Sequence, residues 1–171
     1  KKKNENVIFI SGHFDNFELM AMTLEKRGMN LAAIYRPLNN YFMNKIMEYL
    51  RKKYICKNQI KKGISGVKYS IELIKKNYSI ALMIDQRVSE GEKVNFFSEP
   101  CYTTTLPAQL ALKFNLNIVP IFIERNNDNT FDMKIYEPLK SNQYNNKLEI
   151  TKKLNEIMEA MISQNPNQWI W

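Results

Sequence analysis

Short apolar runs alternate with stretches of helical periodicity along this sequence. Three runs are apolar almost throughout, as expected for strands buried on both faces: residues 6–11, 31–35 and 79–84. Between and after them, apolar side chains recur every three or four residues, which predicts helices over 16–27, 40–52, 64–77, 105–115 and about 147–163. Parallel strands need crossover connections and cover on both faces, so this alternation predicts an α/β fold.

The C-terminal half adds an antiparallel portion. Runs 117–124 and 131–137 bracket the polar turn RNNDN, which is typical of a hairpin. The expected fold is a central, mostly parallel mixed sheet flanked by helices, in a single domain over residues 1–171. Residues 54–56 are interpreted as a short strand, and residues 91–103 as loop.

The formal net charge of +8 invites a nucleic-acid interpretation. Twenty of the 25 basic residues are lysines scattered along the chain, however, so we predict no nucleic-acid partner. A basic surface still suits an acidic partner or an anionic membrane. The two cysteines show no metal-ligand spacing, which favours a reduced, cytosol-facing compartment.

Both ends of the sequence are abrupt. The first strand begins a few residues from the start, no initiator methionine is present, and the last residues are NQWIW. No apolar run approaches the roughly 18–20 residues that span a bilayer. We therefore expect a fragment of a longer protein, truncated at both ends.

The only histidine, His13, directly follows the first predicted strand and precedes a helix. Ligands of parallel sheets bind at the carboxyl ends of strands, where Arg36 and Asp85 also fall. A helix N-terminus disfavours imidazolium, and a neutral imidazole can act as a general base. Glu18, five residues on, would orient the ring, so that the pair deprotonates an alcohol for attack on an acyl carbonyl.

A structural alternative remains open for the same stretch. Asp15 and Glu18 fit a capping box, with Asp15 as N-cap and Glu18 as the third helical residue. His13 would then be an ordinary turn residue. Likewise, Arg51 could be a solvated charge on its helix, and Asp85 a helix or turn cap.

The stretch GHFDNFE resembles the His-x4-Glu motif of the bacterial lipid A biosynthesis acyltransferases. Further blocks agree in order and spacing: YRPLNN, Arg51 fifteen residues after Arg36, the stretch ending in IALMIDQR, VNFFSEPCYTTTLPAQLALKF, and the terminal PNQWIW. The resemblance covers nearly the whole chain. One departure is Ser98, which stands where the family usually has glycine.

The resemblance implies transfer of a fatty acyl chain from acyl carrier protein, or acyl-CoA, to a hydroxyl of a lipid A precursor. It implies a glycerolipid-acyltransferase-like fold at the cytoplasmic face of the bacterial inner membrane, anchored by a segment absent from this chain. His13 would be the general base and Glu18 its partner, with no metal, no cofactor and no covalent acyl-enzyme. The implied substrate-binding residues are Arg51, Asp85, Arg36 and Gln86.

Roles within that set follow from the resemblance only. Arg51 would hold a phosphate or polarise the thioester carbonyl, and Asp85 would fix Arg51 or the loop. Three other functions stay open. They are an acyltransferase for another glycerolipid or glycolipid acceptor, a non-catalytic basic module that binds membrane surfaces, and a catalytically inactive relative. The first of these groups typically carries Asp at the acid position, which Glu18 and the PNQWIW block argue against.

Overall fold

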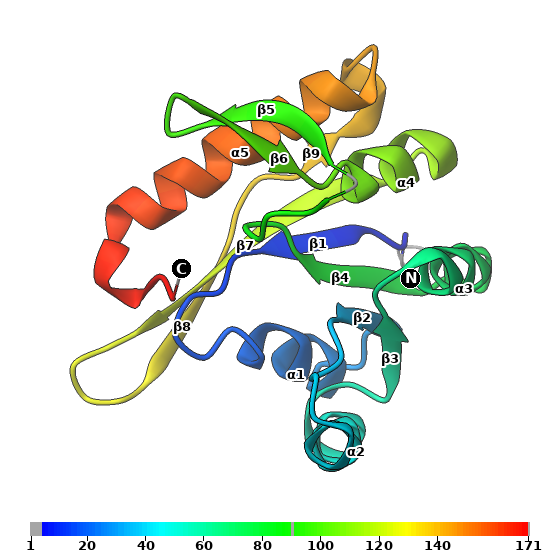
Figure 1. The fold of residues 1–171 in the computed structure, drawn as a ribbon, viewed down its shortest axis with the longest axis vertical. Coiled ribbons are helices and arrows are strands. Elements are labelled where there is room, and N and C mark those ends of the chain that lie inside the picture. The colour runs from blue at the N-terminus through cyan, green and yellow to red at the C-terminus, as the bar shows by residue number, and fades with distance from the viewer. Residues whose placement is uncertain (1–4, 90, 171) are drawn as a thin grey trace. The chain divides into compact units, whose positions relative to one another are not determined.

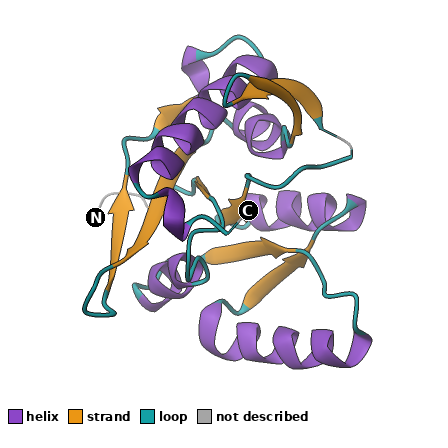
Figure 2. Ribbon diagram, turned by 60° about the vertical axis from the view of Figure 1, so that its left-hand side comes forward, coloured by secondary structure: helices purple, strands orange, loops and turns teal. Residues whose placement is uncertain are grey.

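The computed structural model describes residues 5–89 and 91–170. The chain divides into two compact units, both discontinuous in sequence. The first unit contains Glu18–Leu82 together with the residues before Ile8, and the second contains Ile8–Phe17 together with the residues from Met83 onward. Figures 1 and 2 show helices and strands alternating along the chain.

The first unit is built on three parallel strands. Strand β2 (Leu31–Tyr35) lies between β3 (Asn58–Lys61) and β4 (Ser79–Met83), with Ala32 in register with both Asn58 and Ile80. The helices are α1 (Leu19–Lys26), α2 (Tyr41–Leu50) and α3 (Ile64–Lys75). Helix α1 packs on β2, and α3 packs on β2 and β3. Strands β2 and β4 bury small and branched side chains, as their apolar composition predicts, whereas the polar strand β3 buries only Ile60.

The second unit is centred on a long, buried strand, β7 (Asn117–Arg125). Strand β1 (Ile8–Ser11) pairs with it in parallel, while β8 (Phe131–Ile135) and β9 (Leu139–Lys140) pair with it antiparallel. A separate hairpin is formed by β5 (Glu92–Phe96) and β6 (Glu99–Thr103), and the helices are α4 (Leu106–Phe114) and α5 (Lys147–Gln164). Short 3-10 turns cover Ser141–Gln143 and Pro166–Gln168.

Helix α5 supplies one wall of the second unit's core. It runs alongside the β5–β6 hairpin in Figure 1 and packs on β5 and α4. Its side chains Ile150, Leu154 and Met158 are fully or almost fully buried. Asn155, on the same buried face, donates to the Asn95 carbonyl oxygen and so ties the helix to the hairpin.

The predicted fold class is confirmed. The fold is α/β, with a mostly parallel, mixed sheet flanked by helices, and the 117–137 segment forms the expected antiparallel hairpin. The predicted helices are all present, with ends that differ by a few residues. None of the helices in the described residues combines the length and apolar composition needed to cross a bilayer. Trp171, the last residue of the PNQWIW block, lies outside the described residues.

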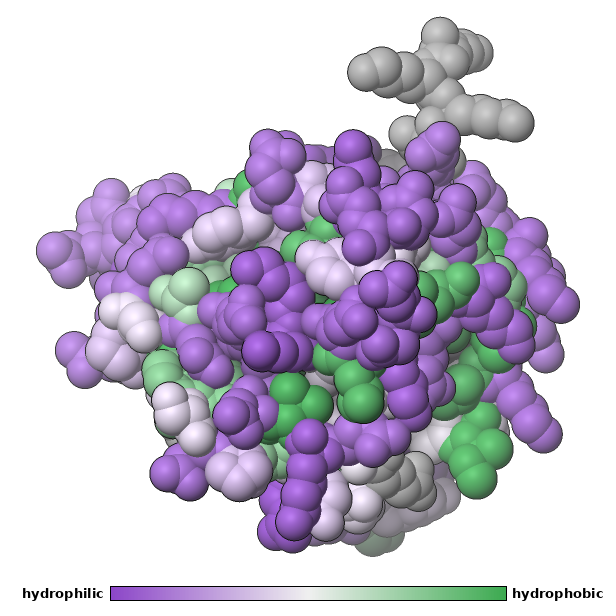
Figure 3. Space-filling model, turned by 90° about the horizontal axis from the view of Figure 1, so that it is seen from above, coloured by the Kyte–Doolittle hydropathy of each residue, from purple (hydrophilic) through white to green (hydrophobic). Residues whose placement is uncertain are grey.

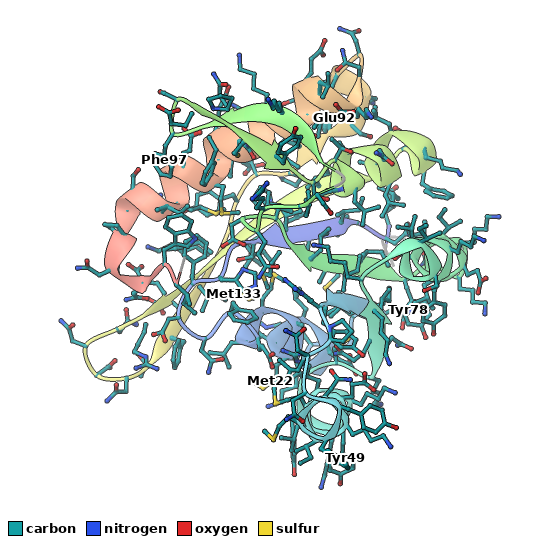
Figure 4. All side chains as sticks on the ribbon, viewed as in Figure 1. Met22, Tyr49, Tyr78, Glu92, Phe97 and Met133 are labelled. Carbon is teal, nitrogen blue, oxygen red and sulfur yellow. The ribbon has the colours of Figure 1, made fainter. Side chains whose placement is uncertain are left out.

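Two local predictions are wrong. Residues 54–56 are not a strand, because α2 continues as a π-helical turn over Arg51–Ile55, in which the Cys56 N–H donates to the Arg51 carbonyl. Residues 91–103 are not loop but the β5–β6 hairpin. Its two turn residues, Phe97 and Ser98, have φ of 49° and 66° without the Asn-Gly signature of such turns. Phe97 marks the tip of this hairpin in Figure 4.

The positive φ of Ser98 favours glycine, the residue usual at this position in the family that the sequence resembles. This conformation yields a stability prediction. A left-handed conformation costs a residue with a Cβ roughly 1–2 kcal/mol. We expect Ser98→Gly to raise the free energy of unfolding by about 1 kcal/mol in urea titrations, after allowing for the extra chain entropy of glycine. The matched control is Ser65→Gly in α3, which should lower it by roughly 0.5–1 kcal/mol. Destabilisation by Ser98→Gly would contradict the turn as described.

Candidate active site

The carboxylate of Asp85 is the centre of the candidate site in the second unit. Its side chain is 0% exposed, and that of His13 is 13% exposed. His13 Nδ1 lies 2.7 Å from Asp85 Oδ1, and the His13 backbone N–H donates to Oδ2 at 2.7 Å. A carboxylate only accepts hydrogen bonds, so Nδ1 carries the proton of this contact, and in a neutral imidazole the lone pair is then on Nε2.

His13 and Asp85 each closely follow the end of a strand. His13 comes two residues after β1, and Asp85 comes two residues after β4. The Ile84 N–H donates to the Ser11 carbonyl, so the two segments leave the strand ends side by side. Gly12 makes this approach possible. A Cβ there would lie 3.1 Å from Asp85 Oδ2 and 2.8 Å from Met158 Sδ, which is too close for the sulfur.

Residues 168–170, within the PNQWIW block, contact Asp85 and the His13 loop. Trp169 Nε1 donates to Asp85 Oδ2 at 3.0 Å and so gives the carboxylate a third hydrogen bond. The Ile170 N–H donates to the His13 carbonyl, and the Asp15 N–H donates to the Gln168 carbonyl. The loop that carries His13 is therefore held by backbone bonds as well as by Asp85.

The capping-box alternative for Asp15 and Glu18 is wrong. Helix α1 begins at Leu19, with Glu18 in the N-cap position and no side-chain capping bond. The Asp15 carboxylate instead pairs with Arg125 Nε at 2.7 Å, and Asp15 has a φ of 33°. These contacts fix the loop after His13 to strand β7.

Two further side chains contact the His13 ring. The Phe17 ring packs against it edge-on, with centroids 4.6 Å apart. Gln86 Nε2 lies 3.4 Å from His13 Nε2, at the edge of hydrogen-bonding distance. The nitrogen that would accept a proton therefore faces a polar amide, while the body of the ring rests on an aromatic side chain.

A second charged pair lies in the first unit. Arg51 donates to Glu18 Oε1 through Nε at 2.8 Å and through Nη2 at 2.6 Å. The Arg51 side chain is 15% exposed, so its interpretation as a solvated charge is wrong. Within the described part of the chain, Arg51 Nη1 is buried with no hydrogen-bond partner. A buried guanidinium N–H without a partner is costly.

A polar cluster supports Arg51 from the side of β2. The guanidinium carbon lies 5.4 Å from the centre of the Tyr35 ring, and the Tyr35 hydroxyl donates to Glu48 Oε1 at 2.6 Å. Lys61 and Asn44 bind the same oxygen at 3.0 and 2.8 Å. Hydrogen bonds from Tyr35 and then Lys61 lower the pKa of Glu48 to about 2, while burial raises the pKa of Tyr35 above its usual range. Glu48 therefore stays ionised, and it anchors the inner face of α2.

The candidate residues that the sequence analysis named fall into three places. His13, Asp85 and Gln86 meet in the second unit, and Glu18 and Arg51 pair in the first. Arg36 is exposed and directly follows β2. Trp169 had no predicted role at Asp85, because an indole donor 84 residues away in sequence carries no local signal. Among the described residues, no group of three or more His, Cys, Asp or Glu side chains could hold a metal ion.

Comparison with known proteins identifies the family of this chain. The family model for bacterial lipid A biosynthesis acyltransferases matches residues 1–171, and the chain belongs to that family of enzymes. "Lipid A biosynthesis acyltransferase 2" of Shigella flexneri is 22% identical over 178 residues. "Lipid A biosynthesis myristoyltransferase" of Escherichia coli (strain K12) is 23% identical over 176 residues. The alignments cover 100% of this chain but 55% and 53% of these relatives, so the chain spans about half their length.

The indole donor at Asp85 can be tested separately from the bulk of its ring. Trp169→Phe keeps an aromatic side chain but leaves a fully buried carboxylate with one hydrogen bond fewer. We expect a loss of about 2 kcal/mol in the free energy of unfolding, measured by circular dichroism in urea. Because His13 is the only histidine, its imidazole Nδ1–H resonance should also move in the NMR spectrum.

The control for this variant is Phe96→Leu, which reduces the ring contact with Trp169 and keeps the indole N–H. It should leave the His13 resonance in place. An unmoved His13 resonance in Trp169→Phe would mean that the indole does not support the pair.

Proposed function

We propose that this protein transfers a fatty acyl chain from an acyl carrier protein thioester, or acyl-CoA, to a hydroxyl of a lipid A precursor. Family membership and the names of the relatives support the acceptor class and the reaction type. The observation that carries the proposal is the buried Asp85 carboxylate on His13 Nδ1, since this arrangement makes Nε2 a base. We further propose that the reaction takes place at the cytoplasmic face of the inner membrane.

In the proposed mechanism, His13 Nε2 takes the proton of the acceptor hydroxyl as its oxygen attacks the thioester carbonyl. The resulting imidazolium is stabilised by the Asp85 carboxylate, which already accepts from Nδ1. The tetrahedral intermediate then collapses, the C–S bond breaks, and Nε2 returns the proton to the leaving sulfur. The products are an ester and a free thiol, so the enzyme ends as it began and needs no cofactor.

Arg51 is proposed to bind negative charge. One edge of its guanidinium is held by Glu18, and the buried Nη1 is the donor left for a substrate oxygen. A phosphate of the acceptor and the developing oxyanion of the thioester both offer such an oxygen. Arg36, exposed at the carboxyl end of β2, is proposed to bind a further anionic group of either substrate.

Glu18 and Gln86 each support one of these residues, Arg51 in the first unit and His13 in the second. Glu18 fixes the orientation of Arg51, because both hydrogen bonds of the fork end on one of its oxygens. Its pairing with His13, which the family motif implies, stays a prediction that the assay below includes. Gln86 places its amide beside Nε2, where it can hydrogen-bond the acceptor hydroxyl as that group exchanges its proton.

The roles of His13, Asp85 and Glu18 are tested by acyl transfer from carrier-protein thioesters to a tetra-acylated lipid A precursor, using the full-length protein. His13→Ala should lower kcat by roughly 10²–10⁴-fold, because it removes the base. Asp85→Asn and Glu18→Gln should each lower kcat by at least about 10-fold, the first through loss of the imidazolium's partner and the second through a misplaced Arg51.

The matched controls change exposed carboxylates of the same two units. Asp132→Asn on β8 and Glu72→Gln on α3 should retain wild-type rates. Wild-type kcat in His13→Ala, with its fold intact by circular dichroism, would refute the proposed base. Transfer to a glycerolipid acceptor but not to the lipid A precursor would refute the proposed acceptor.

Arg51→Lys tests the fork separately. Lysine keeps the charge but cannot bind Glu18 through two nitrogens and a substrate oxygen through a third. We expect kcat/KM for transfer to fall by about 10–100-fold, which corresponds to losing one or two charge-assisted hydrogen bonds. Arg27→Lys, at the exposed C-terminal end of α1, is the control and should be neutral. Equal kcat/KM in the two variants would remove Arg51 from the site.

A further inference from the structure

Helix α2 carries a continuous apolar face that points away from the protein. The exposed side chains of this face are called the α2 outer face below: Phe42, Met43, Ile46, Tyr49 and Leu50. Phe42 is 76% exposed and Ile46 is 52% exposed, although both are fully apolar. Four members of this face, Phe42, Ile46, Tyr49 and Leu50, have the helical spacing that predicted a helix over residues 40–52. Figure 4 shows Tyr49 on α2, at the outside of the first unit.

Two polar side chains of the same helix, Asn44 and Glu48, point inward. Glu48 binds Tyr35 and Lys61, and Arg51, which directly follows the helix, binds Glu18. Asn44 donates to Glu48 and accepts from the Leu38 N–H. Helix α2 therefore has the reverse of the usual pattern, in which the apolar stripe packs on the core.

This reversal leaves α2 without a buried residue. Ten-residue helices gain most of their stability from burying one face, and the outer face of α2 contributes none of that burial here. Elsewhere, exposed apolar side chains are scattered. Eight of the fifteen large ones in the described residues lie between Leu38 and Tyr54. In Figure 3, which views the molecule from the side of α5 and the β5–β6 hairpin, hydrophilic side chains predominate.

Lysines and tyrosines surround the α2 outer face. The Lys45 ammonium lies 4.4 Å from the centre of the Tyr41 ring, and the Lys53 ammonium lies 5.5 and 5.0 Å from the rings of Tyr49 and Tyr54. Lys52 is also exposed. The helix's one acidic residue, Glu48, points inward. The border of the apolar face is therefore positively charged.

We propose that the α2 outer face, with its lysine and tyrosine border, docks on the surface of an anionic lipid bilayer. Apolar side chains enter the boundary between headgroups and acyl chains, while tyrosine hydroxyls and lysine ammonium groups stay at headgroup level. The lysines meet anionic headgroups, which supplies the charge complementarity. The inference rests on the proposed function only in that a lipid acceptor requires the enzyme at a bilayer.

A carrier protein fits this surface less well. An acidic protein would pair with Lys45, Lys52 and Lys53, but the centre of the face is apolar and carries no hydrogen-bonding group except the Tyr49 hydroxyl. Lipid acyl chains match such a centre without leaving polar groups unpaired. The carrier protein and a second copy of this chain are therefore treated as outcomes that the test must distinguish.

The test places an environment-sensitive fluorophore on a single cysteine. Cys101→Ser removes the partly exposed thiol, while Cys56 is buried, and burial raises its pKa to about 12, so it stays unlabelled at pH 7. Ile46→Cys reports on the α2 outer face, and Ile64→Cys, on the exposed start of α3 in the same unit, is the matched control. The full-length protein is added to phosphatidylcholine vesicles, with and without phosphatidylglycerol, that contain nitroxide lipids at several depths.

We expect the label at position 46 to be quenched most by nitroxides about 5–10 Å below headgroup level, and the label at position 64 to be unaffected. Replacing Lys45 and Lys53 with Gln should weaken docking about 25-fold in vesicles with phosphatidylglycerol, at about five-fold per lysine. Equal quenching of the two labels overturns the proposal. The proposal is also overturned if, without lipid, adding carrier protein or raising the protein concentration shields the label at position 46 from water.

The docking proposal and the proposed function can fail separately. In Phe42→Ser with Ile46→Ser, transfer to an acceptor dispersed in detergent should match wild type, while transfer to an acceptor in vesicles should fall. If the wild-type protein transfers no acyl chain in either detergent or vesicles, only the proposed function is contradicted, since the quenching pattern needs no catalysis. Quenching without any difference in vesicle transfer would overturn the role of docking in substrate access.

Discussion

The second unit depends on a carboxylate that is taken entirely out of water. Burying Asp85 is unfavourable unless its oxygens are satisfied, and three donors do so: the His13 backbone, the His13 ring and the Trp169 indole. These donors come from the end of β1 and from the segment after α5. One buried charge therefore fixes the His13 loop, the orientation of the imidazole and the course of the PNQWIW segment together. Gly12 leaves the space in which this can happen.

The first unit has a comparable cluster of charged and polar side chains around Arg51. Its guanidinium is held on one side by Glu18 and lies over Tyr35, whose hydroxyl is bound to Glu48. The π-helical turn that begins at Arg51 sets this side chain inward at the end of α2. The inward polar face of α2 and its outward apolar face are thus two results of the same placement. Asn44 and Glu48 join the charged cluster, and the apolar side chains of the helix are exposed.

The strands and helices could be predicted from the sequence better than the hydrogen bonds between side chains. Uniformly apolar runs identify β1, β2 and β4, because strands covered on both faces leave little room for polar residues. The β5–β6 hairpin escaped notice, since Phe97 and Ser98 occupy left-handed positions that glycine or asparagine usually marks. Periodicity found the stripe on α2 but not its direction. His13 and Asp85 were selected by their places at strand ends, whereas the bonds between Asp85 and His13 and between Arg51 and Glu18 join residues 72 and 33 apart, which no local pattern reports.

The hydrogen bond from Trp169 also bears on the order of folding. Trp169 lies 84 residues after Asp85, which itself lies 72 residues after His13. Contacts between such distant segments form late, because the loop-closure entropy of the intervening chain must be overcome first. During synthesis, β1 and its histidine leave the ribosome long before the tryptophan that completes the carboxylate's surroundings. A nascent or prematurely terminated chain would thus have an Asp85 carboxylate with one hydrogen bond fewer, which favours its unfolding and leaves it open to proteolysis.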